Sequence, residues 1–176
     1  MSPTVSIVAP SLAATHAVAS TIAACSRVGD IIVLAGEMGA GKTAFAQGFG
    51  RALGVVEPIT SPTFTLVQTY ATPRGLFHHA DVYRLEQLHE VADLALGELA
   101  EFRGIVVVEW GDVVSAVLGE HLEVRLGLAA EPPDDDQPLL DHARRITITP
   151  SGRTWAERWQ LLTAQLDALD LGTAAC

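Results

Sequence analysis

One segment of the chain has the residue types and the spacing that bind a phosphate group. Residues 36–43 read GEMGAGKT and fit the pattern G-x-x-x-x-G-K-[ST]. Glycines in such a loop allow positive φ angles, so that backbone N–H groups can turn inward around an anion. A chance match is rare, because glycine makes up only about 7% of average sequences. The residues expected to hold the phosphates are Gly36, Met38, Gly39, Ala40, Gly41, Lys42 and Thr43.

The last two residues of this loop have distinct expected roles. In a phosphate-binding loop of this type the lysine, here Lys42, reaches the β- and γ-phosphates, and the hydroxyl of Thr43 ligates Mg²⁺. Lys42 is also the only lysine in the chain, whose net charge is −10. The charge of a bound phosphate must therefore be offset locally, by this loop, a cation and a few arginines. The alternative is a glycine-rich turn between a strand and a helix with no ligand.

A nucleotide site also needs an acidic residue for Mg²⁺ or water, and two candidates are present. Glu109 follows the apolar run 105–108, a predicted buried parallel strand, and ligands of α/β sheets bind beyond the carboxyl ends of such strands. Asp81 ends a second β-like run, in which period-2 alternation puts His79, Asp81 and Tyr83 on one face. The alternatives are an ordinary strand-end carboxylate for Glu109 and a helix N-cap for Asp81.

A short Ser-Pro-Thr-Phe segment, residues 61–64, follows the helix predicted after the phosphate loop. Nucleotide switches place at this point a threonine that senses Mg²⁺ and the γ-phosphate, which makes Thr63 a further candidate. The alternative is a simple turn formed by serine and proline.

The elements that must position these residues alternate between strands and helices. Short apolar runs ending in turn residues predict strands, and 3.6-residue periodicity predicts helices. The fold class is therefore α/β: a P-loop NTPase-like three-layer fold with a mixed sheet, in which parallel core strands join an antiparallel hairpin between flanking helices. The predicted strands are 4–9, 30–36, 64–71, 76–82, 105–108, 122–128 and 145–149. The predicted helices are 11–26, 42–53, 87–101, 113–118 and 154–169.

Length and composition favour a single domain over residues 1–176, 49% of which are hydrophobic. The segment 131–142 contains an acidic, proline-rich stretch, and we interpret it as a solvated insertion loop because strand signals continue on both sides. Residues 170–176 are expected to form a frayed tail. Trp155 and Trp159 lie four residues apart on the terminal helix, which favours core packing over a partner surface.

Other features favour a cytoplasmic protein. Cys25 and Cys176 do not have the spacing of a disulfide scaffold or a zinc site, no apolar run is long enough to span a bilayer, and no signal-peptide pattern is present. The acidic charge also makes direct binding to nucleic acid unfavourable.

Taken together, four motifs resemble the TsaE (YjeE) family, the ATPases of tRNA threonylcarbamoyladenosine biosynthesis. The matching segments are 36–43, 61–64, the His-Ala-Asp-Val-Tyr-Arg-Leu run at 79–85 and Glu109-Trp110. Their order and spacing agree with the family over roughly residues 5 to 155. The phosphate loop alone is generic, whereas the combination is specific. Gly111-Asp112 departs from the Pro-Glu of many members.

The resemblance implies a function and a partner. It implies an ATPase that uses ATP and Mg²⁺, is weak alone, and supports turnover of the complex of TsaD and TsaB. That complex transfers a threonylcarbamoyl group to N6 of adenosine 37 in tRNA, so tRNA is a partner only indirectly.

The resemblance also implies roles for single residues. Lys42 binds phosphates, Thr43 and Glu109 bind Mg²⁺, and Thr63 and Asp81 belong to a mobile catalytic region. The remaining transfers place side chains around the nucleotide: Trp110 beside the site, Arg144 before the last strand, and Thr15 near the base.

Three other functions are alternatives to this ATPase. A small-molecule kinase fits the length and the phosphate loop, although a hairpin follows where a helical substrate arm is expected. A GTPase that selects guanine with N-K-x-D is excluded, because the chain contains no asparagine. A nucleotide-dependent assembly factor would need ATP binding and not its cleavage.

Overall fold

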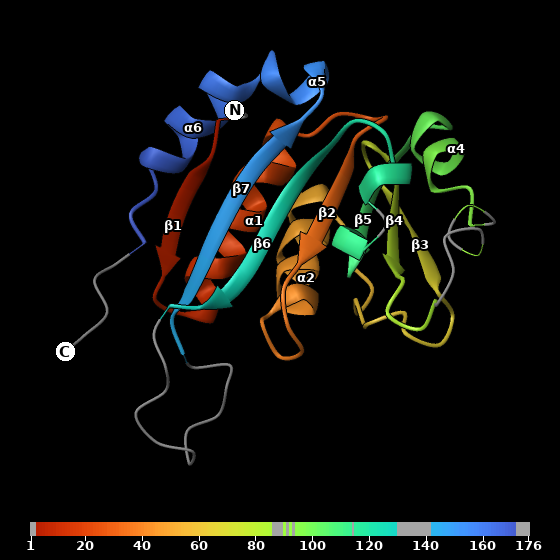
Figure 1. The fold of residues 1–176 in the computed structure, drawn as a ribbon, viewed down its shortest axis with the longest axis horizontal. Coiled ribbons are helices and arrows are strands. Elements are labelled where there is room, and N and C mark those ends of the chain that lie inside the picture. The colour runs from red at the N-terminus through yellow and green to blue at the C-terminus, as the bar shows by residue number, and fades with distance from the viewer. Residues whose placement is uncertain are drawn as a thin grey trace.

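A seven-stranded mixed sheet organises the molecule, with the strand order β1-β7-β6-β2-β5-β4-β3 (Figure 1). This computed structural model describes residues 3–85, 90, 92, 94–113, 115–129 and 142–171. The acidic insertion predicted at 131–142 lies outside the described residues except for His142, and so do residues 172–176 of the predicted tail.

The strands and helices follow the predicted order. The strands are β1 (Val5–Ala9), β2 (Ile31–Ala35), β3 (Val67–Thr72), β4 (Gly75–Asp81), β5 (Gly104–Glu109), β6 (His121–Leu128) and β7 (Arg144–Ser151). The helices are α1 (Leu12–Cys25), α2 (Lys42–Leu53), α4 (Leu96–Glu101), α5 (Arg153–Ala156) and α6 (Trp159–Asp167). Two 3-10 turns, η1 (Gly111–Val113) and η2 (Ser115–Val117), follow β5.

Four neighbouring strands, β6, β2, β5 and β4, run parallel, and β3, β7 and β1 are antiparallel to their neighbours. The predicted mixed sheet and the β3–β4 hairpin are thereby confirmed. The parallel set is larger than the two strands predicted from apolar runs, because β6 pairs in parallel with β2 and β4 pairs in parallel with β5. The carboxyl ends of β2, β4 and β5 consequently lie at one edge of the sheet, where ligands of α/β folds bind.

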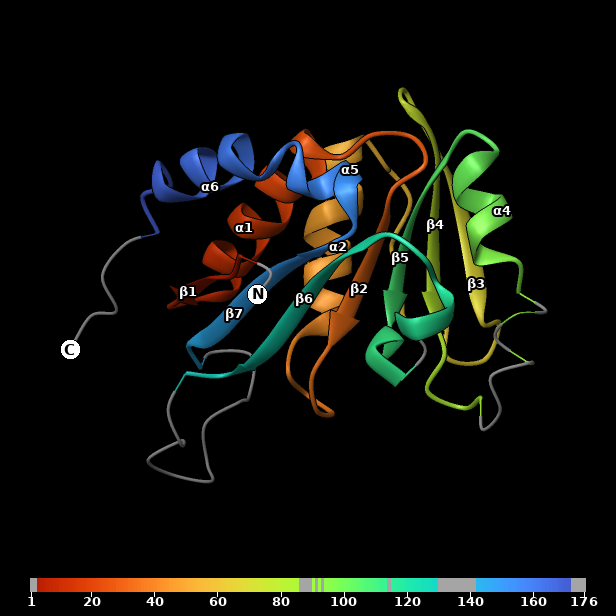
Figure 2. The same cartoon turned by 45° about the horizontal axis from the view of Figure 1, so that its top comes forward.

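The two faces of the sheet carry separate cores. Helices α1, α2 and α6 cover one face, and their core continues onto the inward side chains of β1, β7 and β6. A smaller core beneath α4 covers the other face over β2, β5 and β4. Figure 2 shows α1, α2 and α6 on one side of the sheet and α4 on the other. Three layers, as predicted, are therefore present over one half of the sheet. The half formed by β6, β7 and β1 has two layers. Exposed side chains on the outward face of that half include Arg125 of β6 and Arg145 of β7.

Some predicted helices are interrupted. The helix predicted over 87–101 is interrupted at Ala95, which adopts a left-handed conformation (φ 49°): Glu90 and Ala92 are helical before it, and α4 begins after it at Leu96. The helix predicted over 154–169 is divided between α5 and α6 around Arg158. The short helix predicted over 113–118 is replaced by the two 3-10 turns.

Trp155 is 1% exposed within the helix-side core and Trp159 packs against it, which confirms the core interpretation of this pair. The strand predicted over 64–71 begins only at Val67, because residues 63–65 form a turn and Leu66 is left-handed (φ 63°).

Candidate active site

The phosphate-binding loop joins the end of β2 to the start of α2. Gly36, Gly39 and Gly41 have positive φ angles of 132°, 77° and 104°. At Gly36 a side chain would also collide with the sheet, since a Cβ there would lie 2.2 Å from the carbonyl oxygen of Leu126. Helix α2 starts at Lys42, as predicted, so its unpaired N–H groups and partial positive charge face the loop.

Lys42 is buried and already engaged. Its Nζ donates hydrogen bonds to the carbonyl oxygens of Gly36 and Glu37, both at 2.7 Å, and lies 3.5 Å from the ring centroid of Trp110. Burial lowers the pKa of Lys42 from its ordinary value, and the nearby carboxylates, chiefly Glu109, oppose that shift. The ammonium group therefore lies beside the loop, with Trp110 next to the site as expected.

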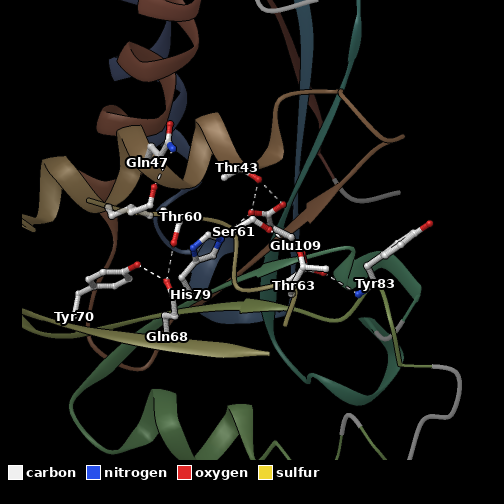
Figure 3. Close-up of polar contacts among 12 residues, drawn as sticks. Thr43, Gln47, Thr60, Ser61, Thr63, Gln68, Tyr70, His79, Tyr83 and Glu109 are labelled. Atoms are coloured by element: carbon white, nitrogen blue, oxygen red, sulfur yellow. Dashed lines mark hydrogen bonds and ion pairs between the residues drawn. The ribbon is translucent and has the colours of Figure 1, made fainter. Parts of the chain in front are cut away.

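Glu109 at the end of β5 has two hydrogen-bond donors (Figure 3). The Thr43 hydroxyl donates to both carboxylate oxygens, at 2.9 Å to Oε1 and 3.0 Å to Oε2. His79 Nε2 lies 2.8 Å from Oε1. The structure thus joins the last residue of the phosphate loop to Glu109, across 66 positions of sequence.

Asp81 lies beside Glu109, because the two residues are register partners on β4 and β5. Its Oδ2 accepts hydrogen bonds from the hydroxyls of Ser61, at 3.1 Å, and Thr63, at 2.8 Å. Its Oδ1 accepts the backbone N–H of Tyr83 at 2.9 Å, in a turn. The helix N-cap considered for Asp81 is therefore wrong, and the face shared by His79 and Asp81 is confirmed.

These groups surround one open cavity of about 300 Å³. Loop residues line one side of the cavity, and the carboxylates of Asp81 on β4 and Glu109 on β5 line the other. The strongly exposed Met38 lies on its rim. The lining residues are Met38, Gly39, Gly41, Lys42, Thr43, Ala44, Ser61, Thr63, Asp81, Glu109 and Trp110.

Thr15 and Arg144 meet on the other side of the loop. Both line a hollow of only about 10 Å³ together with Gly41. Arg144 donates from Nε to the Ala40 carbonyl at 2.9 Å and from Nη2 to the Gly39 carbonyl at 3.3 Å. The Thr15 hydroxyl donates to the carbonyl of Ser11, the N-cap of α1. In this structure Arg144 therefore braces the loop backbone, and a nucleotide contact by either side chain stays a prediction.

The residues present are suited to a magnesium ion bound together with phosphates. A threonine hydroxyl that donates its proton to Glu109 still has lone pairs for a cation. Mg²⁺ prefers oxygen ligands and is commonly held by one or two protein groups plus substrate phosphates and water. The described part of the chain contains no cluster of three or more His, Cys, Asp or Glu side chains that could hold a metal alone.

Two members of the site were missed as site residues. Ser61 and His79 belong to segments that the sequence singled out, but neither was assigned a role. The alternation of β4 already placed His79 on the face of Asp81, and that signal could have identified it. The contact with Glu109 could not be deduced, because it depends on β4 and β5 being neighbours.

Comparison with known proteins identifies the family of the chain. A profile of the family described as "Threonylcarbamoyl adenosine biosynthesis protein TsaE" matches residues 9–135. The chain belongs to the TsaE family. It is 35% identical over 156 residues to the tRNA threonylcarbamoyladenosine biosynthesis protein TsaE of Bacillus subtilis, covering 89% of each chain. The TsaE of Treponema pallidum is 43% identical over 120 residues, which cover 68% of this chain and 82% of that one.

A solved structure has the same fold. The crystal structure of Bacillus subtilis YdiB matches with a TM-score of 0.69 and 28% identity, covering 95% of this chain and 96% of that one. The predicted resemblance and fold class are thereby confirmed. Among the described helices of the chain, none is long and apolar enough to cross a membrane.

Proposed function

We propose that this TsaE-family chain is a Mg²⁺-dependent ATPase that acts in the cytoplasm on the TsaD–TsaB complex. In this role it supports turnover of the complex during formation of N6-threonylcarbamoyladenosine at position 37 of tRNA, and meets tRNA only indirectly. One observation carries the proposal: Lys42, Thr43 and Glu109 converge on one cavity beside Asp81 and Thr63. Membership of the TsaE family supports the biological setting.

The residues divide the work of phosphoryl transfer, which consists mainly of positioning and charge stabilisation. Lys42 offers its ammonium group to the phosphates, and the loop N–H groups surround them. Thr43 and Glu109 hold Mg²⁺, which when bound offsets charge on the phosphates. Thr63 and Asp81, already hydrogen-bonded to each other, position the attacking water.

The resting contacts account for weak activity of the chain alone. Lys42 is held by two carbonyl oxygens and Trp110, and the hydroxyl of Thr63 is held by Asp81. Each group has to exchange these partners for ligand contacts before it can act. A partner that orders the 61–64 segment would favour that exchange, because nucleotide switches are controlled in this way.

The test is steady-state ATP hydrolysis with Mg²⁺, measured with and without purified TsaD–TsaB, using Lys42→Ala as the blank. We expect the complex to stimulate hydrolysis and the variant to lose nucleotide binding or turnover. ATP binding and turnover that are intact in Lys42→Ala would contradict the site.

The same assay separates the proposed role from a small-molecule kinase. ATP bound by wild type but not hydrolysed faster with TsaD–TsaB would contradict the partner-dependent role. It would favour a kinase, and a screen of phosphoryl acceptors would then identify the substrate.

A further inference from the structure

A buried histidine contacts Glu109 and has no part in the mechanism above. His79 lies on β4, is 0% exposed, and has its Nε2 2.8 Å from Glu109 Oε1. We propose that His79 is a positioning residue that fixes the Glu109 carboxylate and thereby sets the affinity of the nucleotide site for Mg²⁺. This inference rests on the proposed function, since it concerns the same cation.

The chemistry of the pair determines the direction of the hydrogen bond. An ionised carboxylate only accepts hydrogen bonds, so the hydrogen between the two side chains is on Nε2 of His79. Glu109 is then held from two elements: from α2 by the Thr43 hydroxyl and from β4 by the imidazole. The Thr43 hydroxyl alone reaches both oxygens and does not distinguish them. His79 binds only Oε1 and so defines the rotation of the carboxylate.

The imidazole ring is itself fixed. Phe77, two residues earlier on the same face of β4, stacks on it with centroids 6.1 Å apart and ring planes 12° apart. Nδ1 of His79 is buried and has no hydrogen-bond partner within the described residues. Leaving a buried polar atom without a hydrogen bond is destabilising. An apolar side chain would avoid that penalty, so the polar contact that does exist, to Glu109, accounts for a histidine at this position.

The next residue, His78, provides a matched control. It is also buried on β4, but alternation turns it to the opposite face, where its Nδ1 lies 2.9 Å from the hydroxyl of Thr69. Replacing His78 removes a buried imidazole from the same strand without touching Glu109.

The test compares three variants of the full chain, His79→Gln, His79→Asn and His79→Ala, with His78→Gln as the control. Calorimetric titration with ADP, with and without Mg²⁺, gives the nucleotide affinity and its dependence on the cation. The amide nitrogen of glutamine is as many bonds from the backbone as histidine Nε2, whereas that of asparagine is one bond shorter. Glutamine should therefore restore the contact and asparagine should not.

We expect all four variants to bind ADP as wild type does without Mg²⁺, because the phosphate loop is unchanged. The apparent Mg²⁺ affinity should fall about 10- to 100-fold in His79→Ala and His79→Asn, the usual effect of removing a group that orients a metal ligand. His79→Gln and His78→Gln should stay close to wild type. Equal Mg²⁺ affinity in all variants would overturn the inference, as would an equal loss in His78→Gln.

A second measurement needs no nucleotide. In ligand-free protein the imidazole Nε2–H of His79 should give a protected, downfield proton resonance that shifts in Glu109→Gln and is absent from His79→Gln. Its absence from wild type would overturn the inference even if every variant folds poorly. Wild type that binds no ADP would contradict the proposed function, whereas normal binding without any effect of His79 would contradict this inference alone.

Discussion

Two buried carboxylates lie at opposite ends of the parallel strands, and their partners differ in kind. Asp30 immediately precedes β2, whereas Glu109 ends β5, and they are 4% and 3% exposed. Asp30 receives a bidentate pair of hydrogen bonds from Arg158, at 2.7 and 2.8 Å, and a third from the backbone N–H of Arg27. Within the described residues, the side chain of Glu109 receives hydrogen bonds from one hydroxyl and one imidazole.

The comparison separates a carboxylate with a structural role from the one that we propose to bind Mg²⁺. The charge of Asp30 is neutralised by a permanent cation, and Arg158 also ties the start of α6 to the end of α1 through the Cys25 carbonyl. Glu109 has no guanidinium partner among the residues that the structure describes, and it lines the cavity, so it has capacity for an exchangeable cation. The amino ends of these strands therefore stabilise the fold, and their carboxyl ends hold the site, as is usual for α/β sheets.

The largest expected effect is on the structural side of this comparison. Arg158→Met should lower the free energy of unfolding by about 3–5 kcal/mol, because it leaves Asp30 buried without its counter-charge. Urea denaturation measures the loss, and ADP affinity of the folded fraction should not change. Adding Asp30→Asn should recover part of the stability. If Arg158→Met alone were as stable as wild type, that result would contradict the structural role of Arg158.

On the functional side, Glu109→Gln should slow partner-stimulated ATP hydrolysis by about 100-fold or more, which corresponds to about 2.7 kcal/mol in the barrier. The amide keeps the size of the side chain but removes the negative charge that Mg²⁺ requires. Its unfolding transition should stay near that of wild type. Normal partner-stimulated turnover in this variant would show that Glu109 does not have the assigned role.

A smaller effect is expected at the edge of the site. Thr63→Val removes the hydroxyl that binds Asp81 while keeping the branched shape, and should reduce hydrolysis by about 10-fold, or about 1.4 kcal/mol. Thr65→Val, two residues away and exposed, is the matched control. The comparison is made at saturating ATP, and equal rates in the two variants would argue against a positioning role.

The smallest effect concerns Glu120, an exposed carboxylate that does not line the cavity. Hydrogen bonds from the Thr154 hydroxyl and the N–H groups of Arg153 and Thr154 lower the pKa of Glu120 to about 2 from 4.5. Because the pKa is lower in the folded state, the stabilisation is complete above pH 4.5 and is lost as the pH falls towards 2. Unfolding measured from pH 6 to 3 should therefore depend less on pH in Glu120→Gln than in wild type, and a parallel profile would refute this.

Much of the site could be predicted because its main motif is local. The phosphate loop, the strand before it and the helix after it occupy one continuous segment, so spacing alone placed Lys42 and Thr43. Glu109 followed from the rule that ligands bind beyond parallel strand ends. The alternation of β4 assigned His79 to one face of the strand. It could not identify Glu109 as the partner of His79, because the periodicity of one strand does not indicate which strand lies beside it.

The features that could not be predicted depend on distant contacts. The terminal helix is divided around Arg158, whose side chain reaches Asp30, 128 positions away in sequence. Arg144 braces the phosphate loop across 104 positions. The start of α4 depends on the left-handed conformation of Ala95, and an alanine in a sequence does not indicate that conformation.

The single lysine gives the site a chemical property that the rest of the surface lacks. Lys42 is the one lysine of the sequence, so a reagent that acylates side-chain amines has a single target, and that target is the group that we propose to bind phosphates. In the structure its Nζ is shielded by two carbonyls and an indole ring. The rate at which this amine is acylated therefore reports how often Lys42 breaks these contacts. Under the proposed function, enzymatic acetylation of Lys42 would abolish phosphate binding.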